Sequence, residues 1–238
     1  MDNATYATLT RQSGLMNELQ LVANNIANAS TTGFKSEGLI FSEYVAGLGP
    51  QTESLSMAAA RIKLTDQSQG ALTQTGAPMD LAIEGDGFFL VETPQGQRLT
   101  RAGSFTPDAN GELVTMDGHR VLDAGGAPVF IPQGVGQIGI ASDGTISASG
   151  TAVGQIGIVV ANDPSELRRQ TGTMFEAAAG YAPATGGKIL QGYVEESNVN
   201  PIAEVSRMIE LQRAYELGQS FLDNEDNRIR GVIQAIGR

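Results

Sequence analysis

The stretch LMNELQLVANNIANASTTGFK, residues 15–35, decides how this chain is organised. Its first half carries an apolar seam at steps of four, three and four residues: Leu15, Leu19, Val22 and Ile26. This spacing is typical of a helix that buries one stripe against another helix. Small polar residues follow, and we expect the helix to end near Ser30-Thr31-Thr32-Gly33.

A helix with such a seam needs a partner, and the only comparable pattern lies at the far end, from Pro201 to about Ile236. Asn200 before Pro201 fits a helix cap followed by proline at the first helical position. The apolar residues of this second seam follow a three-four rhythm: Val205, Met208, Tyr215, Leu222, Ile229 and Ile233. We therefore predict that the two ends pair as a coiled coil and hold the rest of the chain as a body.

The middle of the chain has the pattern of a β-rich body. From Asp80 the hydrophobic period becomes two, and the segments 81–83 and 88–91 are strand candidates. Turn pairs such as Asn110-Gly111 and Asp143-Gly144 recur at intervals, which favours a barrel or a sandwich. The predicted class is α+β. Three parts are expected: residues 1–30 with 200–238 as the helical domain, 31–79 as an extended connector and 80–199 as the body.

Composition limits the function. The 238 residues include no cysteine, which excludes disulfides, cysteine metal sites and thiol catalysis. The formal net charge of −11 argues against nucleic acid as a partner, because phosphate binding needs clustered lysines and arginines. No stretch approaches the roughly 20 apolar residues of a membrane helix. The N-terminus lacks the pattern of a cleavable secretory signal, so we expect a cytoplasmic protein or one exported without such a signal.

No motif for chemistry survives inspection. Residues 134–139 match the dinucleotide pattern G-x-G-x-x-G, but a hairpin turn follows where a helix is needed. Asp223, Glu225 and Asn227 are spaced like the start of a calcium loop, but its later glycine and glutamate are missing. His119 is the only histidine and lies beside a turn, without a nucleophile motif nearby. We expect no catalytic, cofactor-binding or metal-binding residue, no cofactor and no small-molecule substrate.

Three motifs together carry a family resemblance. Asn24-Asn25-Ile26-Ala27-Asn28, followed by Thr32-Gly33-Phe34-Lys35, resembles the N-terminal signature of the flagellar rod and hook proteins. Residues 81–89 with 100–105 resemble the body domain that these subunits share. Glu196-Ser197-Asn198-Val199-Asn200, with residues 208–216, resembles their C-terminal signature. The signature residues expected to matter are these: Asn24, Asn25, Asn28, Gly33, Phe34, Ser197, Asn198 and Asn200.

The resemblance implies a structural subunit of the bacterial flagellar rod, the periplasmic axle that carries torque from motor to hook. It implies terminal helices packed as a coiled coil in an inner tube, with β-rich bodies outside. It also implies export by the flagellar type III route without a cleaved signal, and other rod subunits, copies of the same chain and the export apparatus as partners. Length and the first residues look most like the proximal-rod member, with the distal-rod member as the alternative.

Two questions stay open at the level of sequence. Asn24, Asn25 and Asn28 are explained by turn formation at the helix end, which the spacing favours, or by polar contacts to a neighbouring chain. The alternative from another functional class is a β-sandwich binding module with helical ends. The discriminating feature is the state of the two ends in the monomer. A module should have its helices already docked, whereas an assembling subunit should keep its ends loose until neighbours bury the seams.

Overall fold

The chain folds into two compact units in the computed structural model, which describes residues 2–46, 55–132, 134 and 136–236. The first unit comprises residues 1–27, 37–66 and 200–238, and the second comprises 28–36 and 67–199. Residues 1, 237 and 238 of the predicted helical domain, and Val135 of the rejected dinucleotide pattern, lie outside the described residues. The two units differ in content, because the first holds the two α-helices and the second is mainly β. The predicted α+β class is confirmed.

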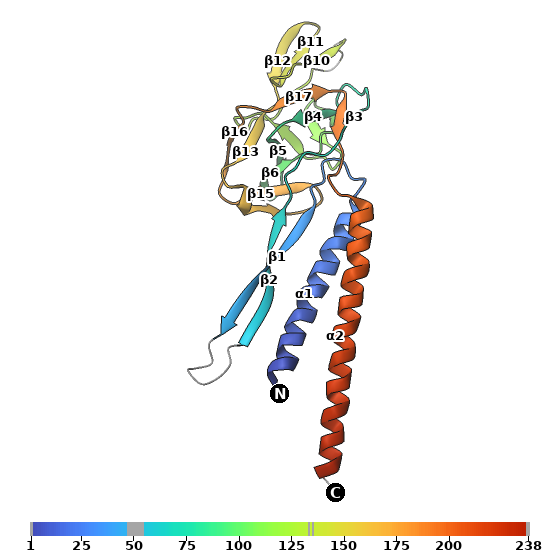
Figure 1. Ribbon diagram of the computed structural model, residues 1–238. Helices are drawn as coiled ribbons and strands as arrows, with labels where there is room; N and C mark the ends of the chain where they lie inside the picture. Colours follow the sequence, from blue (N-terminus) through green and yellow to red (C-terminus); the bar gives the residue numbers. More distant parts are fainter. Residues whose placement is uncertain (1, 47–54, 133, 135, 237–238) are drawn as a thin grey trace. The chain divides into compact units, whose positions relative to one another are not determined.

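The first unit contains the helix pair and one hairpin. Helix α1 spans Asp2–Ala27 and helix α2 spans Pro201–Ile236, the range expected from the sequence. They contact each other, and α1 also contacts the antiparallel hairpin of β1 (Glu37–Ala46) and β2 (Leu55–Thr65) (Figure 1). This hairpin occupies much of the stretch for which the sequence indicated an extended connector, residues 31–79.

Asn200 starts α2 as a side-chain cap. Its Oδ1 accepts hydrogen bonds from the backbone N–H groups of Ile202 and Ala203, both at 3.2 Å. Pro201 follows at the first helical position, where its missing N–H costs nothing. The N-terminal N–H groups of a helix have no partner within the helix, so a cap of this kind typically contributes about 1 kcal/mol.

The second unit is built on one large sheet. Its strand order is β14-β15-β6-β5-β9-β8-β7, with β13 also paired to β5, and β16 paired to β13. The strands of this sheet are β5 (Phe88–Thr93), β6 (Gly96–Thr100), β7 (Phe105–Pro107), β8 (Leu113–Thr115), β9 (Arg120–Leu122), β13 (Ile158–Ala161), β14 (Leu167–Arg169), β15 (Met174–Ala177) and β16 (Tyr181–Pro183). A 3₁₀ turn, η1 (Pro164–Glu166), precedes β14. Because β14 and β7 are the unjoined ends of the path, the sheet is open and the described strands form no closed barrel.

Smaller sheets complete the second unit. One has the order β10-β11-β12, and two antiparallel pairs join β17 to β4 and β18 to β3. Their strands are β3 (Leu72–Gln74), β4 (Leu81–Glu84), β10 (Ile138–Ile140), β11 (Thr145–Ala148), β12 (Thr151–Gln155), β17 (Lys188–Gln191) and β18 (Tyr193–Glu195). The strands predicted at 81–83 and 88–91 are β4 and β5, so both are confirmed.

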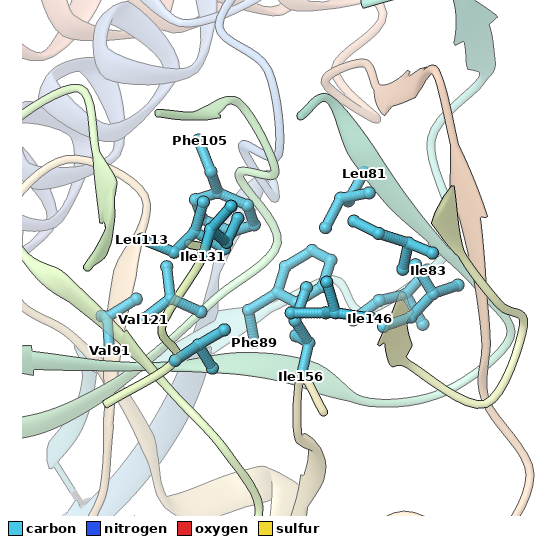
Figure 2. Packing of buried hydrophobic residues seen from close by; sticks show 13 residues of the cluster. Leu81, Ile83, Phe89, Val91, Phe105, Leu113, Val121, Ile131, Ile146 and Ile156 are labelled. Atoms are coloured by element: carbon cyan, nitrogen blue, oxygen red, sulfur yellow. The ribbon is translucent and has the colours of Figure 1, made fainter. Parts of the chain in front are cut away.

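The core of this unit has two halves that share β5. Alternate residues of a strand point to opposite faces, and in β5 both faces are covered. Phe89 and Val91 belong to one apolar cluster, whereas Phe88 and Leu90 belong to the other. Figure 2 shows the Phe89 ring at the centre of the first cluster, near Ile146 and Ile156. Phe89 also meets Phe105 edge to face, with ring centroids 5.1 Å apart. Burial on both faces explains the continuous apolar run of this strand.

Candidate functional site

The helix pair runs antiparallel, as two polar contacts show. Gln12 Nε2 donates to the backbone carbonyl of Tyr215 at 3.1 Å. Six residues further along α1, the carboxylate of Glu18 accepts from Arg207 Nε at 2.9 Å, with a second bond from the same guanidinium. Increasing number in α1 therefore meets decreasing number in α2. Both Gln12 and Glu18 are buried, so polar side chains fix the pairing of these helices.

The predicted seam of α1 is buried unevenly. Val22 is buried, and Leu15, Leu19 and Ile26 are half-buried. The deepest positions also include residues that the apolar pattern omitted: Gln12, Gly14, Glu18, Leu21 and Asn25. The buried face is therefore wider than the seam, because α1 contacts both α2 and the hairpin.

The predicted seam of α2 divides into a half-buried and an exposed part. Met208, Tyr215 and Leu222 are half-buried, and the pattern omitted the one fully buried position, Leu211. The other three seam residues are exposed: Val205 by 44%, Ile229 by 46% and Ile233 by 64%. Apolar side chains are therefore left uncovered along a helix that is amphipathic in sequence.

The asparagines at the end of α1 act on the backbone of their own chain. Asn25 is buried; its amide donates to the carbonyl of Glu37 at 2.9 Å and accepts from the Glu37 N–H at 3.1 Å. Asn28 accepts from the Thr31 hydroxyl at 3.2 Å, which supports a turn. Asn24 is exposed. Asn25 thus ties the end of α1 to the start of β1 within the first unit.

Within the second unit, two segments of distant sequence lie against each other. We call residues 28–36 and 195–199 the junction segments, because they follow α1 and precede α2. The Gly33 N–H donates to the carbonyl of Glu195 at 2.7 Å, and the Asn198 N–H donates to that of Phe34 at 3.4 Å. The Asn198 side chain adds a bond from the Ser36 N–H at 2.7 Å. Two of the three sequence signatures therefore meet directly.

A buried charge cluster joins the body signature to the N-terminal and C-terminal signatures. We define it as Lys35, Arg101 and Glu195. The Glu195 carboxylate accepts from Lys35 Nζ at 2.5 Å, from Arg101 at 3.1 Å and from the Gly70 N–H at 3.0 Å. The side chains of all three charged residues are at most 4% exposed.

Backbone carbonyls complete the shell of the charge cluster. Lys35 Nζ also donates to Ser68 at 2.7 Å, and Arg101 donates to Gly85 at 2.8 Å. Buried charges are tolerated only when they are paired and hydrogen-bonded. Removing one member leaves its partners uncompensated, which typically costs about 3–5 kcal/mol. The cluster therefore locks the two junction segments to the body.

Phe34 and Gly33 fit this site closely. Phe34 is 1% exposed, and the Arg169 guanidinium lies over its ring at 4.2 Å and over the Phe175 ring at 4.7 Å. Such cation–π contacts contribute about 0.5–2 kcal/mol each. Gly33 has φ +69°, and a side chain there would collide with the backbone at Ala102. Only glycine combines that conformation with that approach.

The C-terminal signature residues also have structural tasks. Asn198 donates to Ser68 Oγ at 3.2 Å in addition to its bond from Ser36, and the Ser197 hydroxyl accepts from the Val199 N–H at 3.2 Å. The cap residue Asn200 is described above. These residues shape the junction segment before α2 and the start of that helix.

Sequence reasoning missed the three charged residues of the cluster as site residues. Lys35 and Arg101 lie within the quoted motifs and Glu195 lies one residue before the third motif. The available indication of a buried charge was the position of Lys35, directly after Gly33 and Phe34. The pairing itself could not be found, because it joins positions separated by up to 160 residues.

The described residues offer little for chemistry. No group of three or more His, Cys, Asp and Glu side chains among them is placed to hold a metal ion. No helix in the described part of the chain is long and apolar enough to cross a membrane. Among the described residues, packing and hydrogen bonds account for the sequence motifs, as in a structural protein.

Comparison with known proteins agrees with this class. Residues 8–35 match the family model "Flagella basal body rod protein", residues 82–148 match "Flagellar hook protein FlgE/F/G D1 domain", and residues 190–235 match "Flagellar basal body rod FlgEFG protein C-terminal". The three models follow the order of the three motifs. Each of them contains one member of the charge cluster: Lys35, Arg101 and Glu195.

Relatives that align with nearly the whole chain are flagellar basal-body rod proteins. The chain is 39% identical to the flagellar basal-body rod protein FlgF of Caulobacter vibrioides over 247 residues, covering 100% of this chain and 99% of the relative. It is 38% identical to FlgF of Mesorhizobium japonicum, with the same coverage, and 32% identical to FlgG of Bacillus subtilis, covering 98% of each chain.

The chain belongs to the flagellar basal-body rod protein family. It is a structural subunit of the flagellar basal-body rod and so a component of the motility apparatus. The prediction of a rod protein that is most like the proximal-rod member, FlgF, is confirmed. The binding-module alternative has no support from these relatives.

Proposed function

We propose that this chain is a subunit of the proximal rod, assembled through its terminal helices and transmitting torque from motor to hook. The observation that carries the proposal is the exposed part of the α2 seam, at Val205, Ile229 and Ile233. Ile229 and Ile233 share one side of α2, and exposed apolar side chains that adjoin each other mark an interaction site. The FlgF name of the relatives supports the proximal position, with the distal rod as the alternative.

The helices act in this proposal as a coiled coil that neighbouring subunits complete. Antiparallel contact between α1 and α2 leaves part of each apolar face uncovered, including Leu9 and Met16 on α1. Knobs-into-holes packing against further helices buries such residues. The helices then form the inner layer of the rod, and the sandwich-like β body lies outside. In this proposal the helical domain builds the inner layer, the body forms the outer layer, and the connector lies between them in sequence.

The junction segments carry load between helices and body in the same proposal. The buried charge cluster holds both segments to the sheet, and its members cannot leave it without exposing an unpaired charge in the interior. An axle needs such a joint, because torque is transmitted only through parts that do not yield.

Partners and location follow from this role. The partners are other rod subunits, further copies of the chain and the flagellar export apparatus. The chain passes to the periplasm by that apparatus without a cleaved signal peptide. It catalyses no reaction and binds no cofactor, because its relatives are rod proteins.

The test is genetic and biochemical. In cells deleted for the gene, a tagged copy of the chain should restore swimming and should be recovered in isolated basal bodies with the other rod subunits. Normal swimming without the gene, or absence of the tagged chain from basal bodies of swimming cells, would contradict the proposal.

A further inference from the structure

The junction segment of residues 28–36 is an addition to the body rather than a part of its core. The rest of the second unit, residues 67–199, is one continuous run of chain, whereas this segment lies between α1 and β1 in sequence. Among the described residues it belongs to no strand, and neither apolar cluster of the body includes one of its side chains. Its two large buried side chains, Phe34 and Lys35, are therefore held by contacts outside those clusters.

The charge cluster holds this segment at Lys35, and Arg169 holds it at a second point. Arg169 belongs to β14, an end strand of the large sheet. Its Nη1 donates to the carbonyl of Gly172 at 2.9 Å, in the turn between β14 and β15. Its Nη2 donates to the carbonyl of Lys35. One planar guanidinium thus bonds to the body and to the segment at the same time, which a fixed fork of donors suits.

The same guanidinium joins an aromatic ring of the segment to one of the body. It lies over Phe34 at 4.2 Å and over Phe175 at 4.7 Å from the ring centroids. Phe175 is completely buried and meets Phe88 edge to face, with centroids 5.9 Å apart. Cation–π contacts are stronger where water is excluded. Arg169 therefore connects the segment to the second apolar cluster, which contains both body phenylalanines.

These contacts lead back to the charge cluster and close a circuit. Arg101 lies over the Phe88 ring at 5.3 Å and is also a partner of Glu195. The circuit runs from Lys35 through Glu195 and Arg101 to the two body phenylalanines, and then through Arg169 to Phe34. Phe34 and Lys35 are neighbours in sequence, so each attachment places the segment for the other. Groups in one such network are coupled in free energy.

We propose that Arg169 is a positioning residue of the joint, a second anchor that docks residues 28–36 on the folded body in one cooperative step with the charge cluster. Arg169 lies outside the three stretches that match the family models. Because the segment adds nothing to either apolar cluster, its release is a local opening that leaves the sheets intact. This fastening lies within one chain, so it does not depend on the rod function.

Amide hydrogen exchange of the purified full chain, read by mass spectrometry, measures the docking directly. The N–H groups of Gly33 and Ser36 donate to Glu195 and Asn198, so they exchange slowly while the segment is docked. Arg169→Gln keeps a polar side chain but removes the cation from both rings. We expect exchange in residues 28–36 to become about tenfold faster or more. Exchange in β5 should change by about twofold or less, because the opening is local.

The matched control is Arg168→Gln, which removes the exposed arginine next to Arg169 on the same strand. It should leave exchange in residues 28–36 within about twofold of the wild type. Adding Arg169→Gln to Phe34→Leu should accelerate exchange less than Arg169→Gln does alone, because the ring beneath the cation is already gone. If Arg169→Gln does not fold, Arg169→Lys replaces it and should give a smaller acceleration in the same segment, since a cation remains.

Three results would overturn the proposal. They are fast exchange of residues 28–36 in the wild-type chain, equal effects of the Arg168 and Arg169 variants, and full additivity of the Arg169 and Phe34 variants. Each of them leaves the rod function standing, because recovery of the wild-type chain from basal bodies tests that function separately.

Discussion

The body and the helix pair bury their apolar side chains to very different extents. In the body, Phe89, Leu90 and Val91 of one strand are completely buried, with one cluster on each face. In the helix pair, Leu217 and Ile233 are 73% and 64% exposed. The body is complete as a folded unit, whereas the helices have more apolar surface than one chain covers. The difference supports the proposal that stability and assembly are assigned to different parts of one sequence.

The largest expected effect is the loss of the buried charge at the joint. Glu195→Ala leaves Lys35 and Arg101 buried without their counter-charge, so we expect the free energy of unfolding to fall by about 3–5 kcal/mol. Denaturant unfolding of the purified chain measures this. The control is Glu92→Ala, which removes a half-exposed partner of Arg120 and should cost about 1 kcal/mol or less. Equal effects of the two variants would show that the charge cluster is not a lock.

The same substitution in both regions tests the comparison itself. Leu113→Ala removes a fully buried leucine of the core and should lower the free energy of unfolding by about 2–5 kcal/mol. Leu217→Ala removes an exposed leucine and should change it by about 0.5 kcal/mol or less. For each kcal/mol of stability lost, Leu217→Ala should impair swimming more than Leu113→Ala does. A large loss of stability from Leu217→Ala would mean that this side chain contributes to the fold of the monomer rather than to assembly.

Two glycines sharpen the account of the joint. Both Gly33 and Gly118 have positive φ, so alanine costs about 1–2 kcal/mol in backbone strain at either position. At Gly118 the new methyl group meets nothing within 4 Å, but at Gly33 it collides with the backbone at Ala102. Thermal unfolding should therefore show the greater loss for Gly33→Ala. A loss no greater than that of Gly118→Ala would argue against close contact at the junction.

The smallest expected effect concerns turns on the surface of the body. The backbone N–H of Thr145 and then its hydroxyl donate to Asp143, which lowers the pKa of that carboxyl below 3.8. Because the folded-state pKa is depressed, the contribution is present above the unfolded-state pKa and is lost as pH falls through the folded-state value. NMR titration should show the pKa of Asp143 rising in Thr145→Val. An unchanged pKa would mean that the hydroxyl contributes nothing.

Much of the fold followed from local pattern. Both terminal helices, the cap at Asn200 and the strands at 81–83 and 88–91 are where periodicity and turn residues indicated. These features depend on neighbours within a few residues. The hairpin of β1 and β2 was harder to predict, because the short apolar pieces of this stretch resemble those of an extended connector.

The site was only half predictable. The motifs around Gly33, Phe34 and Asn198 identified the segments, but not that they form one joint. That joint depends on Lys35, Arg101 and Glu195, which are far apart in sequence and whose charges alone suggest a solvated surface. The apolar seams were likewise visible, but burial of Gln12 and Glu18 depends on which helix lies opposite.

One measurement tests most directly the claim that the exposed apolar face of α2 serves assembly. The variant Ile229→Ser with Ile233→Ser is compared with Met116→Ser, which changes an even more exposed apolar residue of the body. Both purified chains should unfold like the wild type. In cells, we predict that the α2 variant is lost from isolated basal bodies and that swimming fails, while Met116→Ser is incorporated normally. Normal incorporation and swimming of the α2 variant would contradict the account.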